Sequence, residues 1–195
     1  LTQEELQKYG FTDITRTLQS TPGVNSYEED GFGLRPNISL RGTSPERSAK
    51  INLMEDGVLI APAPYSAPAA YYFPTIARMQ GLEIVKGSSQ IQYGPNTTGG
   101  AINLITPSIP RIFKGALSAT RGQYGSGNHQ LLVGDSNQRF GYVVNYLNYF
   151  SDGFKVMDGG GDTGFERSDY MIKLQAKSQP SASIYQSLTA KVHYY

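Results

Sequence analysis

The sequence predicts an α+β domain with a small mixed β-sheet and short helices, followed by a run of antiparallel β-strands. Three observations point to this fold class. The composition is typical of a turn-rich β protein, with 22 glycines, 14 tyrosines and only 17% charged residues. The segment Leu82–Thr106 reads as two apolar strands joined by glycine-rich bends. Near the end of the chain, Tyr170–Lys177 and Ser187–Tyr194 alternate with a period of two, which places each set of side chains on its own sheet face.

Charge and cysteine content exclude several classes of function. The formal net charge of +1 indicates neither a nucleic-acid-binding surface nor an acidic tail, so no nucleic acid partner is expected. The absence of cysteine excludes disulfides and thiol catalysis and leaves the compartment open. No apolar run approaches the roughly 20 residues of a transmembrane helix. The chain begins at Leu1 without a Met or a signal peptide, as expected of a processed or trimmed protein.

The first 20 residues are predicted to be helical. Thr2 and Glu5 have the spacing of a capping box, in which each side chain satisfies a backbone N–H of the first turn. A second short helix is expected to start at Thr12 or Asp13 and to stop before Pro22.

The rest of the first domain is predicted to be β-rich. The polar segment Val24–Pro36 reads as a loop, and strands are expected at Ile38–Arg41 and Ile51–Glu55. The segment Ala61–Pro74 has four prolines and is expected to be neither a central strand nor a helix. A helical turn is expected at Ile76–Met79.

Pro107 and Pro110 mark the expected boundary between a first domain, residues 1–110, and a second, residues 111–195. Earlier strands of the second domain are expected at Phe113–Thr120, Gln130–Gly134 and Phe140–Phe150. Turn clusters between them predict an antiparallel meander with tyrosines at strand ends. Alternation alone favours a soluble β-sandwich over a membrane barrel.

Four motifs in the first domain reverse that preference. They are Thr21-Pro22-Gly23-Val24, Ile38-Ser39-Leu40-Arg41-Gly42, Met54-Glu55-Asp56-Gly57-Val58 and the unit Leu82–Thr106. In this order they resemble the signature of the plug domain of TonB-dependent outer-membrane receptors. The resemblance implies a plug domain over residues 1–110. It also implies that residues 111–195 are the first antiparallel strands of a transmembrane β-barrel, which is incomplete in this chain.

The resemblance also implies structural roles for glycines and basic residues. Gly87, Gly94, Gly99 and Gly100 are expected to let the plug backbone turn and pack closely. The spacing from Gly94 to Gly99 is also that of a phosphate loop, but the required lysine and hydroxyl do not follow, so no nucleotide is expected.

Arg41 and Lys86 each precede a glycine at the end of an apolar strand. The resemblance implies that they pair with glutamates on the barrel wall and hold the plug in place. Arginine is usual at the second position, and Lys86 lacks its bidentate fork. The alternative is that both residues are solvated strand-end charges.

The resemblance places ligand contacts on three apical loops, at Ser26–Arg35, Thr43–Ser48 and Ala61–Ala67. The segment Ala63–Pro68 further resembles the apical loop of ferric citrate transporters. Ordinary solvated loops are the alternative reading. The expected ligand-binding residues, whose donors fit an anionic, oxygen-rich ligand, are Arg35, Arg47, Tyr65 and Ser66.

No catalytic or metal site is expected. Glu55 and Asp56 are adjacent on a strand, so their side chains point to opposite faces. His129 and His193 have no metal-ligand pattern, and no serine lies in a nucleophile elbow. We therefore expect no enzyme activity and no cofactor.

The function implied by the resemblance is active uptake of a scarce solute, such as a ferric chelate, across the outer membrane of a Gram-negative bacterium. Its partners would be that solute, outer-membrane lipid and a TonB-type energy-transducing protein acting on a segment N-terminal to the plug. The residues after Pro110 suffice for about five strands of roughly 9–11 residues, whereas plugged barrels use about 22. A longer native protein is therefore expected. The alternatives are a non-transporting receptor or adhesion module that binds a protein or glycan, and a soluble β-rich enzyme.

Overall fold

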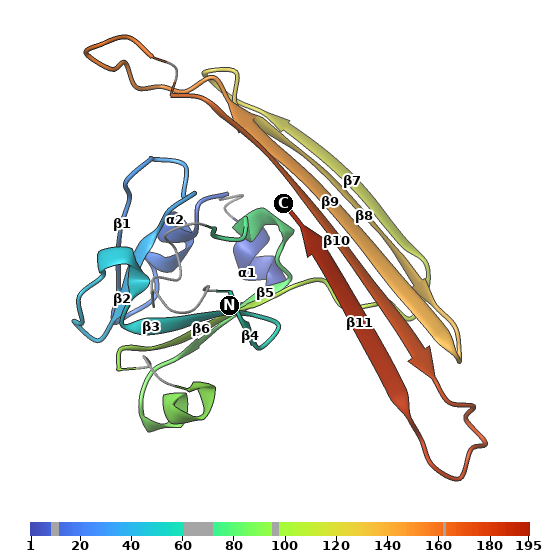
Figure 1. The fold of residues 1–195 in the computed structure, drawn as a ribbon. Coiled ribbons are helices and arrows are strands. Elements are labelled where there is room, and N and C mark those ends of the chain that lie inside the picture. Colours follow the sequence, from blue (N-terminus) through green and yellow to red (C-terminus); the bar gives the residue numbers. More distant parts are fainter. Residues whose placement is uncertain (9–11, 61–71, 95–97, 162) are drawn as a thin grey trace. The chain divides into compact units, whose positions relative to one another are not determined.

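The computed structural model describes residues 1–195 except 9–11, 61–71, 95–97 and 162, and these residues form two compact units. The first unit spans Leu1–Thr106 and the second spans Pro107–Tyr195 (Figure 1). None of the helices in the described residues is long and apolar enough to cross a membrane. The interpretation of Ala61–Pro74 falls largely outside the described residues.

The two predicted helices are confirmed. Helix α1 spans Gln3–Lys8, and its capping box is formed: the Thr2 N–H donates to Glu5 Oε2 at 2.8 Å and the Glu5 N–H donates to Thr2 Oγ1 at 3.3 Å. Helix α2 spans Ile14–Leu18 with Asp13 as its N-cap.

The segment Val24–Pro36 is not all loop, so that prediction is wrong for its first four residues. Val24–Tyr27 form strand β1, which pairs antiparallel with β2, Asn37–Leu40, in a two-stranded sheet. Strand β2 ends at Leu40 rather than at Arg41, because Arg41 has a positive φ of 57° and turns the chain out of the strand.

A four-stranded mixed sheet, in the order β4-β3-β6-β5, forms the centre of the first unit. The strands are β3 (Ile51–Glu55), β4 (Val58–Leu59), β5 (Gly81–Val85) and β6 (Gly100–Ile105). Strands β3 and β6 are parallel and the other pairs are antiparallel. The sequence did not predict β4, a two-residue strand after the Asp56-Gly57 turn.

Three 3-10 turns lie between strands of the first unit: η1 (Glu46–Ser48) precedes β3, η2 (Ile76–Arg78) precedes β5 and η3 (Ser88–Tyr93) precedes β6. The second confirms the helical turn predicted near Ile76. The core draws apolar side chains from both helices and both sheets. Its members are Leu6, Ile14, Leu18, Ile38, Leu40, Ile51, Leu53, Phe73, Ile76, Met79, Leu82, Ile102 and Leu104.

The second unit is one five-stranded antiparallel meander, in the order β11-β10-β9-β8-β7 (Figure 1). Its strands are β7 (Lys114–Arg121), β8 (Gly127–Ser136), β9 (Phe140–Ser151), β10 (Phe165–Lys177) and β11 (Ser187–Tyr194). Strands β8 and β10 start earlier than predicted, whereas β11 has the predicted bounds. The predicted fold class, a mixed-sheet domain followed by antiparallel strands, is confirmed. Within the described residues, the end strands β7 and β11 do not pair with each other, so the sheet is open.

The tight approach of β6 to its neighbours predicts that Gly100→Ala is destabilising. Gly100 has a φ of +146°, and an added Cβ would lie 2.4 Å from Leu40 Cδ1 and 2.5 Å from the Val85 carbonyl oxygen. Overpacking of this kind costs about 1–3 kcal/mol, in addition to the backbone strain. The loss should appear as a reduced free energy of unfolding in urea.

Gly87→Ala is the matched control, because Gly87 also has a positive φ, +122°, but has no atom within 4 Å of the added Cβ. Gly87→Ala should therefore show the strain alone and a smaller loss of stability. Equal losses for the two variants would contradict the steric explanation.

Candidate functional site

The two basic residues of the plug motifs meet at one turn. The Arg41 backbone N–H donates to the Gly23 carbonyl oxygen at 2.9 Å. The Lys86 ammonium donates to the carbonyl oxygen of Pro22. Both residues are exposed. The structure thus brings Arg41 and Lys86, which are far apart in sequence, together beside the Pro22-Gly23 turn.

The loop between β1 and β2 is held by one carboxylate. Asp30 accepts the backbone N–H groups of Phe32 at 2.6 Å, Leu34 at 3.3 Å and Arg35 at 2.9 Å. These bonds fix the backbone that carries Arg35, whose side chain is exposed. The loop that carries Arg35, a candidate ligand-binding residue, is therefore held in place by its own hydrogen bonds.

Arg47 is linked to the same loop by Asn37, which hydrogen-bonds both to Arg47 and to Glu29 of the loop. The Arg47 N–H donates to Asn37 Oδ1 at 2.7 Å, and Asn37 Nδ2 donates to Glu29 Oε1 at 2.8 Å. Arg47 has a positive φ of 49°, and its side chain is exposed. A non-glycine residue in this conformation is uncommon and often marks a functional position. Asn37 thus joins the two loops that carry Arg35 and Arg47. Tyr65 and Ser66, the other two expected ligand-binding residues, lie outside the described residues.

The predicted structural glycines have measurable constraints. A Cβ on Gly99 would lie 2.8 Å from Thr43 Oγ1 and 3.0 Å from the Lys50 carbonyl oxygen. Gly87 and Gly94 have φ values of +122° and +94° with open space around them. At Gly99 and Gly100, close neighbouring atoms therefore leave no room for a side chain. At Gly87 and Gly94 there is room, and glycine is favoured there only by the positive φ.

Sequence reasoning missed a buried ion pair in the first unit. Arg78 Nη2 lies 2.6 Å from Glu55 Oε2, and Nη1 donates to Oε1 at 3.3 Å. The two side chains are 1% and 5% exposed. Nη2 also donates to the Tyr72 hydroxyl at 3.1 Å. The only available signal was an arginine within the apolar stretch Ile76–Met79, which does not reveal its partner.

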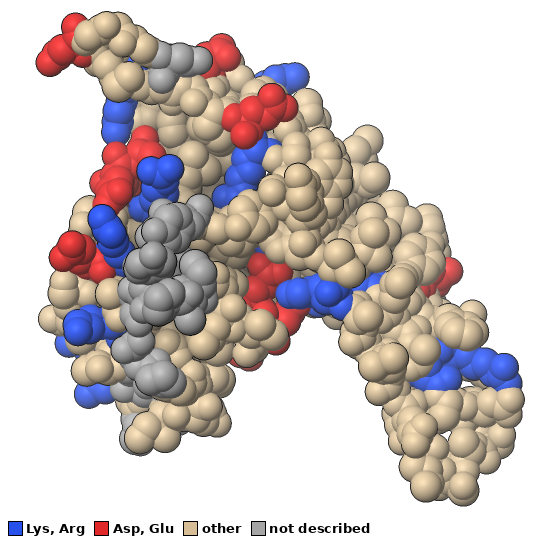
Figure 2. All heavy atoms as spheres, viewed as in Figure 1, with Lys and Arg blue, Asp and Glu red and all other residues tan. Residues whose placement is uncertain are grey.

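One face of the second unit is apolar and exposed. Leu174 is 56% exposed, Leu188 is 72% exposed and Val192 is 67% exposed. Three tyrosines cross this face in a row: the ring centroids of Tyr146 and Tyr170 are 4.9 Å apart, and those of Tyr170 and Tyr194 are 6.4 Å apart. In the view of Figure 2, the lower right part of the sheet is mainly uncharged, with basic side chains gathered toward its end.

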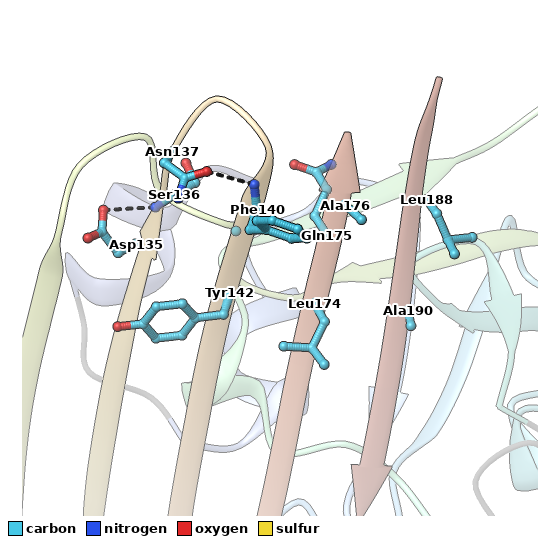
Figure 3. A pocket seen from close by; sticks show the side chains of 11 residues that line it. Asp135, Ser136, Asn137, Phe140, Tyr142, Leu174, Gln175, Ala176, Leu188 and Ala190 are labelled. Atoms are coloured by element: carbon cyan, nitrogen blue, oxygen red, sulfur yellow. Dashed lines mark hydrogen bonds between the residues drawn. The ribbon is translucent and has the colours of Figure 1, made fainter. Parts of the chain in front are cut away.

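A shallow hollow of about 450 Å³ lies on the same face, near the β8–β9 turn. Figure 3 shows Tyr142, Leu174, Leu188 and Ala190 lining it from strands β9, β10 and β11. The polar residues of its lining are Asp135, Ser136 and Asn137 at the turn and Gln175 on β10. An open apolar hollow of this kind fits hydrocarbon better than a charged chelate.

The opposite face of the sheet carries charged and polar groups. Arg167 Nε lies 3.4 Å from Asp169 Oδ2, and His193 Nε2 lies 3.5 Å from Asp169 Oδ1. Lys173 and Lys191 are cross-strand partners on this face. Among the described residues, no group of three or more His, Cys, Asp or Glu side chains could hold a metal ion. As the period-two alternation of the two segments predicts, Leu174, Leu188 and Val192 lie on one face, and Lys173, Lys177 and Lys191 lie on the other.

A mixed-sheet domain followed by an antiparallel meander with one apolar face defines the class of protein. Residues 1–101 match the family described as the TonB-dependent Receptor Plug Domain. The match covers just over half of the chain, which belongs to this family.

Similar solved structures share this fold over nearly the whole chain. The ferric citrate transporter FecA, in its unliganded form, has a TM-score of 0.69 and 21% identity over 99% of this chain and 30% of its own. The ferric yersiniabactin uptake receptor FyuA from Yersinia pestis has a TM-score of 0.73 and 21% identity over 98% of this chain and 30% of its own. The copper transporter OprC has a TM-score of 0.65 and 18% identity over 94% of this chain and 28% of its own. The chain thus spans about a third or less of the length of these proteins.

The buried ion pair predicts a strong asymmetry between single and double substitutions. Arg78→Met leaves the Glu55 carboxylate buried without its charged partner, which costs about 3–5 kcal/mol. The double variant, Arg78→Met with Glu55→Leu, removes both charges and should recover most of that loss. Urea unfolding of the wild type, both single variants and the double variant measures the coupling. Additive losses would show that the two side chains do not depend on each other.

Proposed function

We propose that the receptor carrying this chain takes up a scarce ferric chelate, of the ferric citrate kind or another siderophore, across the outer membrane of a Gram-negative bacterium. Arg35 and Arg47, held by loops that Asn37 joins, support this proposal most directly. Guanidinium groups form strong, directional bonds with carboxylate oxygens. The similarity to the ferric citrate transporter FecA and the ferric yersiniabactin uptake receptor FyuA points to the same class of ligand.

The plug is proposed to gate the barrel lumen without chemical change to the ligand. Arg41 and Lys86 would pair with carboxylates on the barrel wall, because both are exposed beside one turn and each stands at a turn that ends a strand. A TonB-type protein would supply the force that rearranges the plug by acting on a segment N-terminal to it.

The five strands are proposed to be the first strands of a larger barrel, with the apolar face toward lipid. Two features support this arrangement. Strands β7 and β11 each have an edge that pairs with no other described strand. The row of three tyrosines across the apolar face is typical of the aromatic girdle at a membrane interface.

The lipid-facing assignment predicts unequal effects of arginine at two adjacent positions of β11. Leu188→Arg would place a charge on the apolar face, at a cost of about 2–4 kcal/mol near the bilayer midplane. Thr189→Arg is the matched control, because Thr189 accepts a hydrogen bond from Gln175 Nε2 at 3.1 Å on the polar face. Heat-modifiable migration of the complete receptor in gels measures assembly. Equal impairment by the two variants would contradict the assignment.

The ligand proposal predicts that Arg47→Ala weakens the binding of ferric citrate. A hydrogen bond to a charged group contributes roughly 1.5–3 kcal/mol, which corresponds to about a ten- to hundredfold loss of affinity. Arg35→Ala and Tyr65→Ala test the neighbouring loops in the same way. Arg139→Ala is the control, because Arg139 is an exposed arginine between β8 and β9.

Titration with ferric citrate and with a neutral corrinoid separates the possible results. Wild-type affinity for ferric citrate in all loop variants would exclude these loops as the binding site. Binding of the neutral ligand alone would exclude an iron–carboxylate chelate and leave the transporter class in place.

A further inference from the structure

A pair of carboxyl groups links the start of α2 to the loop that follows β1. Asp13, the N-cap of α2, is only 5% exposed, and Glu28 directly follows β1. Thr15 bridges the two: its N–H donates to Asp13 Oδ1 at 2.8 Å and its hydroxyl donates to Glu28 Oε1 at 3.0 Å. The function proposed above makes no use of this pair.

The loop backbone packs directly against the Asp13 side chain. At Gly33, an added Cβ would lie 2.4 Å from Asp13 Oδ1 and 2.8 Å from its Cγ. Asp13 is therefore enclosed by its own helix on one side and by the loop on the other. A change in the charge of Asp13 would therefore affect the contact between the start of α2 and the loop.

The second oxygen of Asp13 needs a proton to be satisfied. Asp13 Oδ2 is buried and accepts no hydrogen bond from any donor in the described residues. Thr15 holds the Glu28 carboxyl through its hydroxyl, and the N–H of the same residue holds Asp13. Two carboxylates are both acceptors, so a bond between them requires one proton. Without the proton, Thr15 holds two negative charges, the buried one of Asp13 and that of Glu28, whose side chain is 31% exposed.

We propose that Asp13 and Glu28 share a proton, and that this shared proton locks the Glu28–Pro36 loop onto the start of α2. Asp13 is then a positioning residue for the loop that carries Arg35. Its effect on ligand binding rests on the function proposed above, whereas the lock itself does not.

The electrostatic surroundings support a shared proton. Burial, followed by the hydrogen bond to Glu28, raises the pKa of the Asp13 carboxyl from 3.8 to about 6, and the bonds from Thr15 act in the opposite direction. The nearby cation is Arg16 on α2, with its Nε 3.9 Å from Glu28 Oε1 and its side chain 57% exposed. Glu29, Asp30 and Arg35 are the other charged groups of the loop. Of these, Asp30 is engaged with three backbone N–H groups, and Glu29 accepts a bond from Asn37.

The direction of the pH effect follows from this shift. The closed junction binds the proton more tightly than the open one, since the pKa of Asp13 is about 6 when closed and near 3.8 when solvated. The junction is therefore stabilised as the pH falls through 6 toward 4, and this gain is lost above 6. Between pH 7.5 and pH 5 the ratio of closed to open junction should rise about tenfold.

Hydrogen–deuterium exchange on the complete receptor in detergent micelles, in the presence of EDTA, tests the lock. The readout is the protection factor over residues 13–36, corrected for the intrinsic exchange rate at each pH. The wild type should show about tenfold greater protection at pH 5 than at pH 7.5. In D13N the amide oxygen still caps α2 and the amide nitrogen donates to Glu28, so protection should be high and equal at both pH values.

Two further variants keep the test decisive. Glu28→Gln should reduce the change in protection well below tenfold, because it removes the shared proton while Asp13 stays buried, and it replaces D13N if that variant folds poorly. Glu29→Gln removes a neighbouring carboxylate of the same loop and should keep the tenfold change. A tenfold change that persists in both D13N and Glu28→Gln would overturn the proposal. A pH dependence that appears only when Ca²⁺ replaces EDTA would assign the pair to a divalent cation and overturn it as well.

Ferric citrate titration separates the lock from the proposed function. If the loop binds ligand, D13N should bind up to tenfold more tightly than the wild type at pH 7.5 and about equally at pH 5. If exchange shows the lock but the two proteins bind alike at both pH values, the carboxyl pair stands and the β1–β2 loop is excluded from the ligand site.

Discussion

The parallel pairing of β3 with β6 is the constraint on which the first unit depends. These strands lie about fifty residues apart in sequence and run from the Ile51–Gly100 pair to the Glu55–Leu104 pair. The Gly99 N–H donates to the Lys50 carbonyl oxygen at 2.8 Å at the start of the pair. At the other end, the Thr106 N–H donates to Asp56 Oδ1 at 2.9 Å. Both ends are thus closed, and Glu55 is held where Arg78 can reach it. Parallel strands need a long connection, and here that connection carries β4, η2, β5 and η3.

The features predicted correctly are those that depend on neighbouring residues. The Thr2 and Glu5 capping box, the β3 strand and the period-two alternation of β11 are local patterns, and each has the predicted bounds or bonds. Strand β1 was missed because Val24–Tyr27 has too few residues to show a pattern. It forms through its pairing with β2, with Val24 opposite Leu40. Tertiary pairing therefore decided a segment whose own composition is typical of a loop.

The candidate site shows the same contrast between what neighbouring residues determine and what tertiary packing determines. The sequence could name Arg41 and Lys86 through a resemblance, but it could not show that both contact the Pro22-Gly23 turn. It could name Asp13 as a helix start, but not the Glu28 carboxyl beside it. A charged residue has the same appearance in a sequence whether it is buried or solvated. Burial and partner are set by the packing of distant segments, and these two properties decide what a charge can do.

Lys86 shows how a departure from the family pattern can be accommodated. An ammonium group has three donors, and one of these goes to the Pro22 carbonyl oxygen. The other two can meet a carboxylate from a range of directions, since lysine is a compact point charge without the fixed fork of arginine. Arg41 has that fork, on a backbone fixed by Gly23 and by a positive φ. The Arg41 backbone and the Lys86 ammonium thus both contact the Pro22-Gly23 turn. In the proposed pairing with the barrel wall, such ion pairs would fix geometry more than they add net stability.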